Sequence, residues 1–158
     1  MSIYTQGDSL QGLSLVINEK NTLKKTGDVK LPDWEFAEVD GQPTNVLKDP
    51  KISIELFDLS PSHIAHIKDG KSILIKGSVR QGLKDVPFKV SVAFRLTKMG
   101  TAIKVGDAVK RSFEGIVYLY EETFDEKQTI RYNEEAIELE FDGSGKNELE
   151  DQKKNLIG

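Results

Sequence analysis

Residues 86–124 read VPFKVSVAFRLTKMGTAIKVGDAVKRSFEGIVYLYEETF, and this stretch decides the fold of the chain. Apolar and polar side chains alternate through residues 86–98, which is typical of a half-buried β-strand. Residues 99–106 contain Gly100 and Gly106, a pattern that predicts a connection. The apolar residues that share one face of the first strand are Phe88, Val90, Val92, Phe94 and Leu96.

The second strand of this predicted hairpin covers residues 107–124. One face carries Val109, Phe113, Val117 and Leu119, whereas the other mixes polar side chains with Ile116, Tyr118 and Tyr120. Both faces are therefore expected to be covered near the end of the strand. Strands usually run for about 3–10 residues, so two strands of this length form a large sheet surface and indicate assembly.

Working outward from the hairpin, the sequence predicts about seven strands and two helices. Ser60 is a good N-cap, Pro61 suits the first helical position and Gly70 a C-terminal stop, so residues 60–69 are expected to be helical. The other predicted strands are 13–17, 51–57, 71–80, 129–132 and 136–141; a terminal helix is predicted at 146–156 and loops at 18–30 and 39–50. These elements predict a mainly β (α+β) fold, an antiparallel sandwich or partly open barrel.

Composition narrows the function classes. The 158 residues predict a single domain, 1–158, and a net charge of −4 disfavours a protein that grips nucleic-acid phosphates. The absence of cysteine excludes disulfides, thiol catalysis and Cys-ligated zinc. No apolar run approaches the roughly 20 residues that span a bilayer, and the first ten residues lack the pattern of a secretory signal. We expect no membrane insertion by this chain.

No convincing catalytic constellation is present, so we expect a protein that is not an enzyme and carries no metal or cofactor. His63 and His66 are three residues apart on the predicted helix, a spacing that can share a metal, but no further ligand accompanies them. Carboxylates are plentiful between Glu121 and Asp142, where alternation with apolar residues favours solvated strand faces over the acid pair of a hydrolase.

The segment 18–50 is weakly patterned and is predicted to be an extended assembly arm. It contains Trp34, the only tryptophan of the chain, close to Phe36. Trp34 either fills the core of its own subunit or anchors in a neighbouring molecule, because aromatic residues are enriched at interface centres. We expect the arm to lack a pocket in its own subunit and to become ordered against a neighbour. The predicted contact residues are Leu31, Pro32, Trp34 and Phe36.

The order of several short motifs resembles the major tail tube protein of contractile-tailed bacteriophages. The motifs are FRLTKM at 94–99, VGD at 105–107, the strand 113–120, FDEK at 124–127, the ending 151–158 and VKLP at 29–32 followed by Trp34 and Glu35. Together they cover roughly two-thirds of the chain, and each is weak alone. Two departures occur: Tyr118 and Tyr120 alternate where the family often has adjacent tyrosines, and Asp125-Glu126 replaces the more usual Asp-Gly.

This resemblance implies a structural virion protein located in the tail and assembled in the host cytoplasm. Its partners would be further copies of itself, in hexameric rings that stack into a tube, and the sheath, baseplate or tube initiator, terminator and tape measure proteins. Each subunit would contribute strands to an inner barrel through which DNA passes without specific binding. The tubes of tailocins and type VI-like injection machines are alternatives that share the fold.

Two questions stay open from the sequence. An acidic strand face is expected to contribute to the lumen, since it would repel phosphate; the candidates are Glu114, Glu138, Glu140 and Asp142. A monomeric β-sandwich binding module is the alternative from another class, with Trp34 and Phe36 lining its ligand site.

Overall fold

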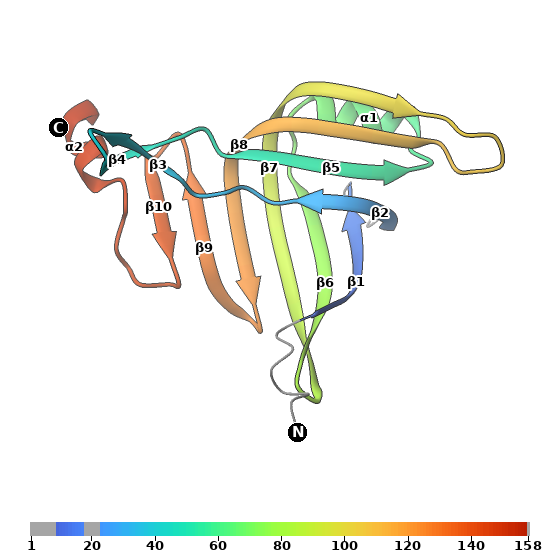
Figure 1. Cartoon of the computed structure of the whole chain (residues 1–158), viewed down its shortest axis with the longest axis horizontal. Helices are drawn as coiled ribbons and strands as arrows, with labels where there is room; N and C mark the ends of the chain where they lie inside the picture. Colours follow the sequence, from blue (N-terminus) through green and yellow to red (C-terminus); the bar gives the residue numbers. More distant parts are fainter. Residues whose placement is uncertain (1–8, 18–22, 158) are drawn as a thin grey trace.

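The computed structural model describes residues 9–17 and 23–157, and in this part of the chain the fold is mainly β and antiparallel (Figure 1). Ten strands and two helices are present in these described ranges. They are β1 (Ser9–Val16), β2 (Leu23–Lys30), β3 (Phe36–Val39), β4 (Gln42–Leu47), β5 (Lys51–Phe57), α1 (Pro61–Lys68), β6 (Ile73–Gln81), β7 (Lys84–Ala102), β8 (Lys110–Phe124), β9 (Lys127–Asn133), β10 (Glu138–Phe141) and α2 (Glu150–Ile157).

The main sheet has eight strands in the order β10-β9-β8-β5-β2-β1-β6-β7, and β7 also pairs with β8. Strand pairing therefore forms a closed circuit. Starting at β8, it passes through β5, β2, β1, β6 and β7 and returns to β8. This is possible because β8 pairs with β5 through its first half and with β9 through its second half, while β7 follows its other edge. β3 and β4 form a separate two-stranded sheet.

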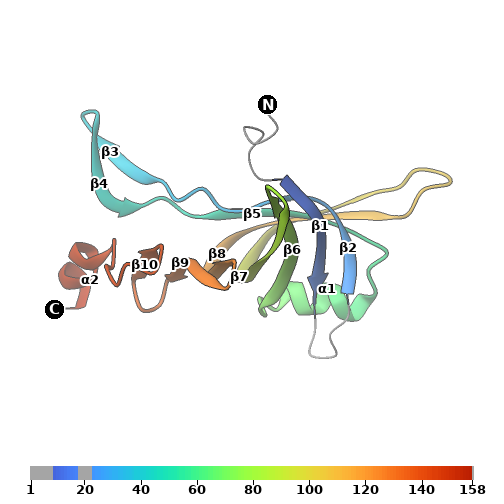
Figure 2. The same cartoon turned by 90° about the horizontal axis from the view of Figure 1, so that it is seen from below.

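The predicted central hairpin is confirmed, but its connection lies at 103–109 and not at 99–106, so the first strand is longer and the second shorter than predicted. β7 has 19 residues and β8 has 15, and their ladder runs from Phe88 paired with Phe124 to Ala102 paired with Lys110. The alternation in β7 places Val90, Val92 and Phe94 in the core, as predicted. The two strands bend along their length, so that their ends beyond the core project from the body (Figures 1 and 2).

A β-bulge changes which face of β8 is buried. Ala93 pairs with Leu119 but Phe94 pairs with Val117, so Tyr118 is the extra residue on β8. An inserted residue moves every following side chain to the opposite face. Consequently Tyr120 is only 2% exposed whereas Leu119 is 37% exposed, and the predicted burial of Leu119 with Val117 is wrong.

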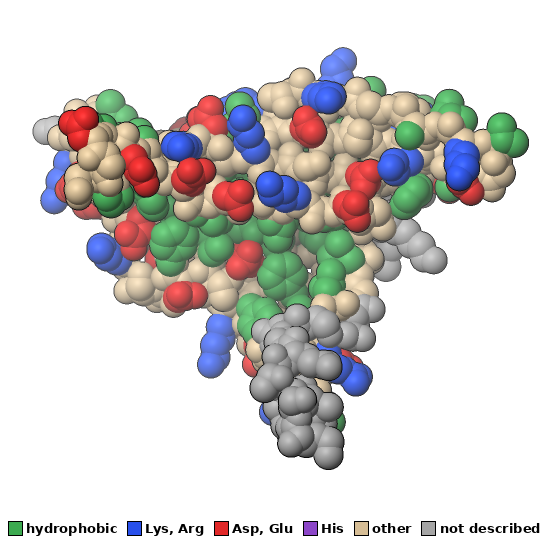
Figure 3. Space-filling view, in the orientation of Figure 1, with side chains coloured by type: hydrophobic (Ala, Val, Ile, Leu, Met, Phe, Trp, Pro, Cys, Tyr) green, Lys and Arg blue, Asp and Glu red, His purple; other side chains and the backbone are tan. Residues whose placement is uncertain are grey.

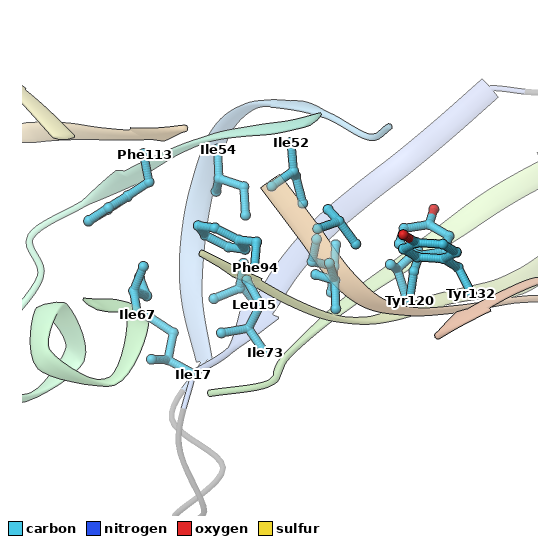
Figure 4. Packing of buried hydrophobic residues seen from close by; sticks show 14 of the residues in the cluster. Leu15, Ile17, Ile52, Ile54, Ile67, Ile73, Phe94, Phe113, Tyr120 and Tyr132 are labelled. Carbon is cyan, nitrogen blue, oxygen red and sulfur yellow. The ribbon is translucent and has the colours of Figure 1, made fainter. Parts of the chain in front are cut away.

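The core lies between the two halves of the bent sheet and is closed at one end by α1. Figure 4 shows Phe94 beneath Ile52 and Ile54, and Ile67 of α1 between Phe113 and Ile17. Tyr120 and Tyr132 extend this cluster toward β9. Gly115 is buried directly against Phe94, because a Cβ at this position would lie 2.3 Å from Phe94 Cδ2 and 2.5 Å from the Arg95 carbonyl oxygen.

Both predicted helices are present. Ser60 precedes α1 with extended backbone angles and Pro61 begins it, as the sequence predicts. α2 begins four residues later than predicted, because Asn147 holds the preceding turn. The Asn147 side chain accepts hydrogen bonds from the backbone N–H groups of Leu139 and Leu149 and donates one to the Ile137 carbonyl.

Two loop predictions are wrong. Residues 23–30 form β2, which pairs with β1 and with β5, and residues 42–47 form β4, which pairs with β3. The sequence of β2, LKKTGDVK, does not alternate between apolar and polar residues. Its ladder with β5 contains an irregularity between Thr26 and Val29, so regular alternation is not expected there. Pairing with β1 through residues 23–25 and with β5 through residues 26–30 therefore gives a strand that the local pattern does not predict.

Candidate functional site: assembly surfaces

The indole of Trp34 packs on its own subunit. Its ring centroid lies 5.1 Å from that of Tyr120 and 5.2 Å from that of Tyr132, both in tilted or edge-on geometry. Pro32 is buried, and Leu31, Trp34 and Phe36 are half-buried against the core. The expectation that this part of the arm lacks a pocket in its own subunit is therefore wrong. Trp34 therefore packs against the core of its own chain. Contact of Leu31, Pro32, Trp34 and Phe36 with a neighbouring subunit stays a prediction.

The outer part of the arm, the β3–β4 hairpin, projects from the body (Figure 2). Asp40 and Gly41 form its two-residue turn with positive φ angles of 52° and 76°, a geometry that favours Asp-Gly. Val39 is 61% and Val46 is 54% exposed. The hairpin meets α2 through a 2.7 Å hydrogen bond from the Asn45 amide to the Asp151 carboxylate. Contact of this hairpin with a neighbouring subunit stays a prediction.

Four strand segments form a flat antiparallel surface, which we call the plate. It consists of residues 26–30 of β2, the whole of β5, residues 110–116 of β8 and residues 94–102 of β7, in that spatial order. In Figure 1 the plate runs along the long axis, between the β3–β4 hairpin at one end and the tip of the β7–β8 hairpin at the other.

The plate has two free edges within the part of the chain that the structure describes. β6 pairs with β7 only through residues 84–92, so residues 94–102 are bonded on one side alone, to β8. β1 pairs with β2 only through residues 23–25, so residues 26–30 are bonded on one side alone, to β5. Such edges offer unpaired backbone donors and acceptors to another strand.

The outer face of the plate is polar, and its charges are mixed. Lys98, Glu114, Ser53 and Lys30 follow one another across a single row of the ladder. Diagonally across β5 and β8, the Lys110 ammonium lies 2.9 Å from the Glu55 carboxylate, and this pairing lowers the pKa of Glu55 and raises that of Lys110. The charged residues of this face are Asp28, Lys30, Lys51, Glu55, Arg95, Lys98, Lys110 and Glu114.

The structure separates the four candidate lumen residues. Glu114 lies on the outer face of the plate. Glu138 and Glu140 lie on β10, where Arg131 approaches both carboxylates and Lys153 of α2 donates to Glu138 at 3.3 Å. Asp142 lies in the turn after β10 with a positive φ of 54°. These three are therefore not on one surface with Glu114, and two of them have cationic neighbours.

A surface hollow among the described residues follows the plate where the arm leaves it. It measures about 720 Å³ and is lined mainly by polar and charged side chains, including Lys30, Glu35, Lys48, Ser53 and Glu114. Two surface ion pairs border it, Lys48 with Glu35 at 3.1 Å and Lys30 with Asp33 at 3.8 Å. An open, charged hollow without a convergent catalytic pair resembles a surface groove rather than an apolar ligand pocket.

The two histidines serve the fold of α1. His63 Nδ1 accepts a hydrogen bond from the Ser60 backbone N–H at 3.3 Å and lies 2.9 Å from the Ser60 hydroxyl. His66 Nε2 lies 2.9 Å from the Ser72 carbonyl oxygen, at the other end of the helix. Within the described ranges no three His, Cys, Asp or Glu side chains are grouped so that they could hold a metal. That neither histidine binds a functional metal remains a prediction.

The buried tyrosines Tyr120 and Tyr132 are expected to lower the free energy of unfolding at high pH. Burial, with a contribution from the charges of Glu134 and Asp49, raises the pKa of Tyr132 to about 12 from its ordinary value of 10.0. Burial and the hydrogen bond to Glu122 raise the pKa of Tyr120 as well. Because the folded-state pKa values are raised, the stabilisation by neutral tyrosine is complete below pH 10 and is lost as the pH rises toward 12.

This expectation is checked by denaturant unfolding between neutral pH and about pH 12. The free energy of unfolding should fall more steeply in the wild type than in the Tyr132→Phe variant, which has no proton to lose at this position. Equal slopes for the two proteins would contradict the assigned pKa.

No known protein family has a model that matches this sequence, and no curated protein matches it. No helix in the described ranges is long and apolar enough to cross a membrane.

Proposed function

We propose that this protein is the major tail tube subunit of a contractile tail, in which hexameric rings stack into the inner tube and form a conduit for DNA ejection. The observation that carries the proposal is the plate with its two free edges. The number of six copies per ring is inferred from the resemblance in motif order. The two free edges of the plate provide a physical means of closing the ring.

The direction of the strands makes the two edges compatible. Each neighbouring pair in the plate is antiparallel, so β2 and β7, at opposite edges of four strands, run in opposite directions. When residues 94–102 of one copy are placed beside residues 26–30 of the next, the two strands are again antiparallel. The alternation therefore continues from copy to copy through one repeated contact that uses two different surfaces, and such a contact generates a ring when its rotation closes.

Ring closure would remove both edges. Six copies of the plate make a barrel of about 24 strands, and a barrel of this size encloses a wide lumen. Within each subunit, the circuit of six paired strands supports a small, partly open barrel from which the plate extends on both sides. Assembly would then protect the backbone groups that a free subunit leaves unpaired.

The outer face of the plate would line the lumen. On this face four lysines and Arg95 are interspersed with three carboxylates, and Arg95 is itself paired with the Glu134 carboxylate at 2.7 Å. Of the four acidic candidates only Glu114 belongs to this face. Strong, lasting contact with DNA requires clusters of Lys and Arg that release counterions from phosphate. A wall of alternating charges provides no such cluster, which is compatible with DNA that slides past it.

The direct test is electron microscopy of the purified protein, together with its mass by size-exclusion chromatography. We expect rings or tubes with sixfold symmetry. A protein that stays monomeric at high concentration, with and without a tail initiation complex, would refute the proposal. A tube from a tailocin or a type VI-like machine would use the same plate and is distinguished by the absence of packaged DNA in the parent particle.

A proline on the free β7 edge should block ring closure. Thr97 is the extra residue of a bulge, because Leu96 pairs with Gly115 and Lys98 with Glu114. Proline is tolerated at bulges, but it removes the backbone donor and disfavours a further strand at that edge. We therefore expect Thr97→Pro to give folded subunits, judged by circular dichroism, with at least a tenfold loss of rings.

The matched control for this variant is Thr97→Val. It loses the 3.0 Å hydrogen bond from the Thr97 hydroxyl to the Glu114 carbonyl, as the proline variant does, but it keeps the backbone N–H. Rings should form with Thr97→Val at close to the wild-type level. If Thr97→Pro also assembles normally, β7 is not the edge that closes the ring.

A further inference from the structure

The tip of the β7–β8 hairpin, residues 103–109, carries two of the most exposed apolar side chains of the described chain. Ile103 is 77% exposed and Val105 is 100% exposed, with Lys104 between them. The tip projects beyond the body in both views (Figures 1 and 2). Single exposed apolar residues are ordinary, but two on one projecting tip form a small apolar knob that is suited to a partner.

The end of this hairpin is also basic. Residues 98–111 contain Lys98, Lys104, Lys110 and Arg111 against Asp107 alone, a net charge of +3 in a chain whose overall charge is −4. A partner surface that binds the tip is therefore expected to combine apolar side chains with carboxylates.

A surface of that composition exists on the same molecule, in a hollow of about 570 Å³ over β8, β9 and β10. Its apolar lining continues the buried face of the sheet, where Glu122 and Phe141 both pair with Ile130. Figure 3 shows apolar side chains gathered in a band below the plate on this face of the molecule. The residues that line the hollow are Glu122, Phe124, Thr129, Ile130, Phe141 and Asp142.

The carboxylate of Glu122 is held in position within this hollow. One of its oxygens accepts a hydrogen bond from the Tyr120 hydroxyl at 2.7 Å, and the other accepts one from the Thr129 hydroxyl at 2.7 Å. The hollow also lies in the most acidic part of the chain. Between Glu121 and Asp142, nine carboxylates accompany only Lys127 and Arg131, a net charge of −7.

We propose that the tip of one copy inserts into the hollow of a second copy, with Ile103 and Val105 against Phe124, Ile130 and Phe141 and with Lys104 facing Glu122 and Asp142. The tip lies at one end of the long axis and β10 lies in the opposite half of the molecule, inward of α2 and the β3–β4 hairpin (Figure 1), so this contact joins copies along the long axis. The plate edges, in contrast, join copies side by side. The inference rests on the proposed tube, to which it adds the contact that stacks one ring on the next.

The absence of cysteine in the chain makes a clean crosslinking test possible. Two single variants, Val105→Cys and Ile130→Cys, are mixed, assembled and then oxidised. A disulfide requires the two Cβ atoms to lie within about 3.5–4.5 Å, so it forms only where the tip enters the hollow. We expect a covalent dimer that contains one copy of each variant. The matched control replaces Val105→Cys by Leu83→Cys, on another exposed turn at 94% exposure, and should give at least tenfold less dimer.

A second pair of variants tests stacking itself. The double variant that carries both Ile103→Ser and Val105→Ser should leave single rings intact. Its tubes should be at least tenfold shorter than those of the wild type when their lengths are measured by electron microscopy. Lys104→Glu should also weaken stacking, because it places a like charge beside Glu122. The effect should be larger at low salt than at high salt, since salt screens the repulsion.

The outcomes separate this inference from the proposed tube. Normal tubes without a Val105–Ile130 crosslink overturn the inference and leave the tube proposal intact. The crosslink in a protein that forms no rings supports the inference and overturns the tube proposal. A protein that stays monomeric and forms no crosslink overturns both.

Discussion

The Gly115→Ala variant is expected to lose about 3 kcal/mol or more of its free energy of unfolding, the upper part of the range for overpacking in a core. The added methyl group would lie 2.3 Å from Phe94 Cδ2 and 2.5 Å from the Arg95 carbonyl oxygen. The phenyl ring can rotate away only into a filled core, and the carbonyl belongs to the backbone of the paired strand. The ladder between β7 and β8 must therefore move, and this ladder links the core to the plate.

Gly12→Ala is the matched control for this variant. Gly12 also lies in a strand, but no heavy atom approaches within 4 Å of an added Cβ, and its backbone has no positive φ that alanine would resist. Its stability should stay within about 1 kcal/mol of the wild type, with any change toward higher stability. Chemical denaturation of the two variants is the measurement, and a Gly115→Ala protein as stable as Gly12→Ala would show that the strands yield without cost.

The Trp34→Ala variant should lose about 2–3 kcal/mol of stability, somewhat below the 3–5 kcal/mol typical of fully buried tryptophan, because this indole is half-buried. The lost stability has two sources. One is the apolar surface that Trp34 buries against Tyr120 and Tyr132, and the other is the pair of aromatic ring contacts. Since residues 31–35 connect β2 to the projecting β3–β4 hairpin, the same change should also release that hairpin from its position.

Val39→Ser is the comparison for Trp34→Ala. Val39 lies on the same arm but is 61% exposed, so its replacement should change the free energy of unfolding by no more than about 0.5 kcal/mol. Trp34→Phe should keep part of the stability, because a smaller ring still covers the tyrosines. If Trp34→Ala is no less stable than Val39→Ser, the indole contributes nothing to its own core, and a neighbouring subunit becomes its only remaining partner.

Local sequence pattern predicts the elements whose stability is itself local. The alternation of Ile52, Ile54 and Leu56 predicts β5, and Ser60 with Pro61 predicts α1. β2 was not predicted, because its lysine-rich sequence becomes a strand only when β5 pairs with it. The bulge at Tyr118 was not predicted either, since an extra residue in one strand is defined by its partner and not by its neighbours in sequence.

The candidate site shows the same division. Glu114, Glu138 and Glu140 all alternate with apolar residues, and the pattern correctly indicates that each points away from the core side of its strand. Alternation does not indicate which outer surface a strand belongs to, and only the ladder separates β8 from β10. The partners of Trp34 lie more than eighty positions away in the sequence, so no local signal selects between its own core and a neighbour.

In the proposed ring, the even number of strands in the plate would limit how such a protein can change during evolution. A plate with one strand more or one strand fewer would have edges that run in the same direction, and adjoining copies would then meet with parallel pairing. That switch alters the hydrogen-bond geometry of every junction at once. Strands should therefore be gained or lost in pairs, most simply as whole hairpins. The bore of such a conduit would then change in steps of two strands per subunit.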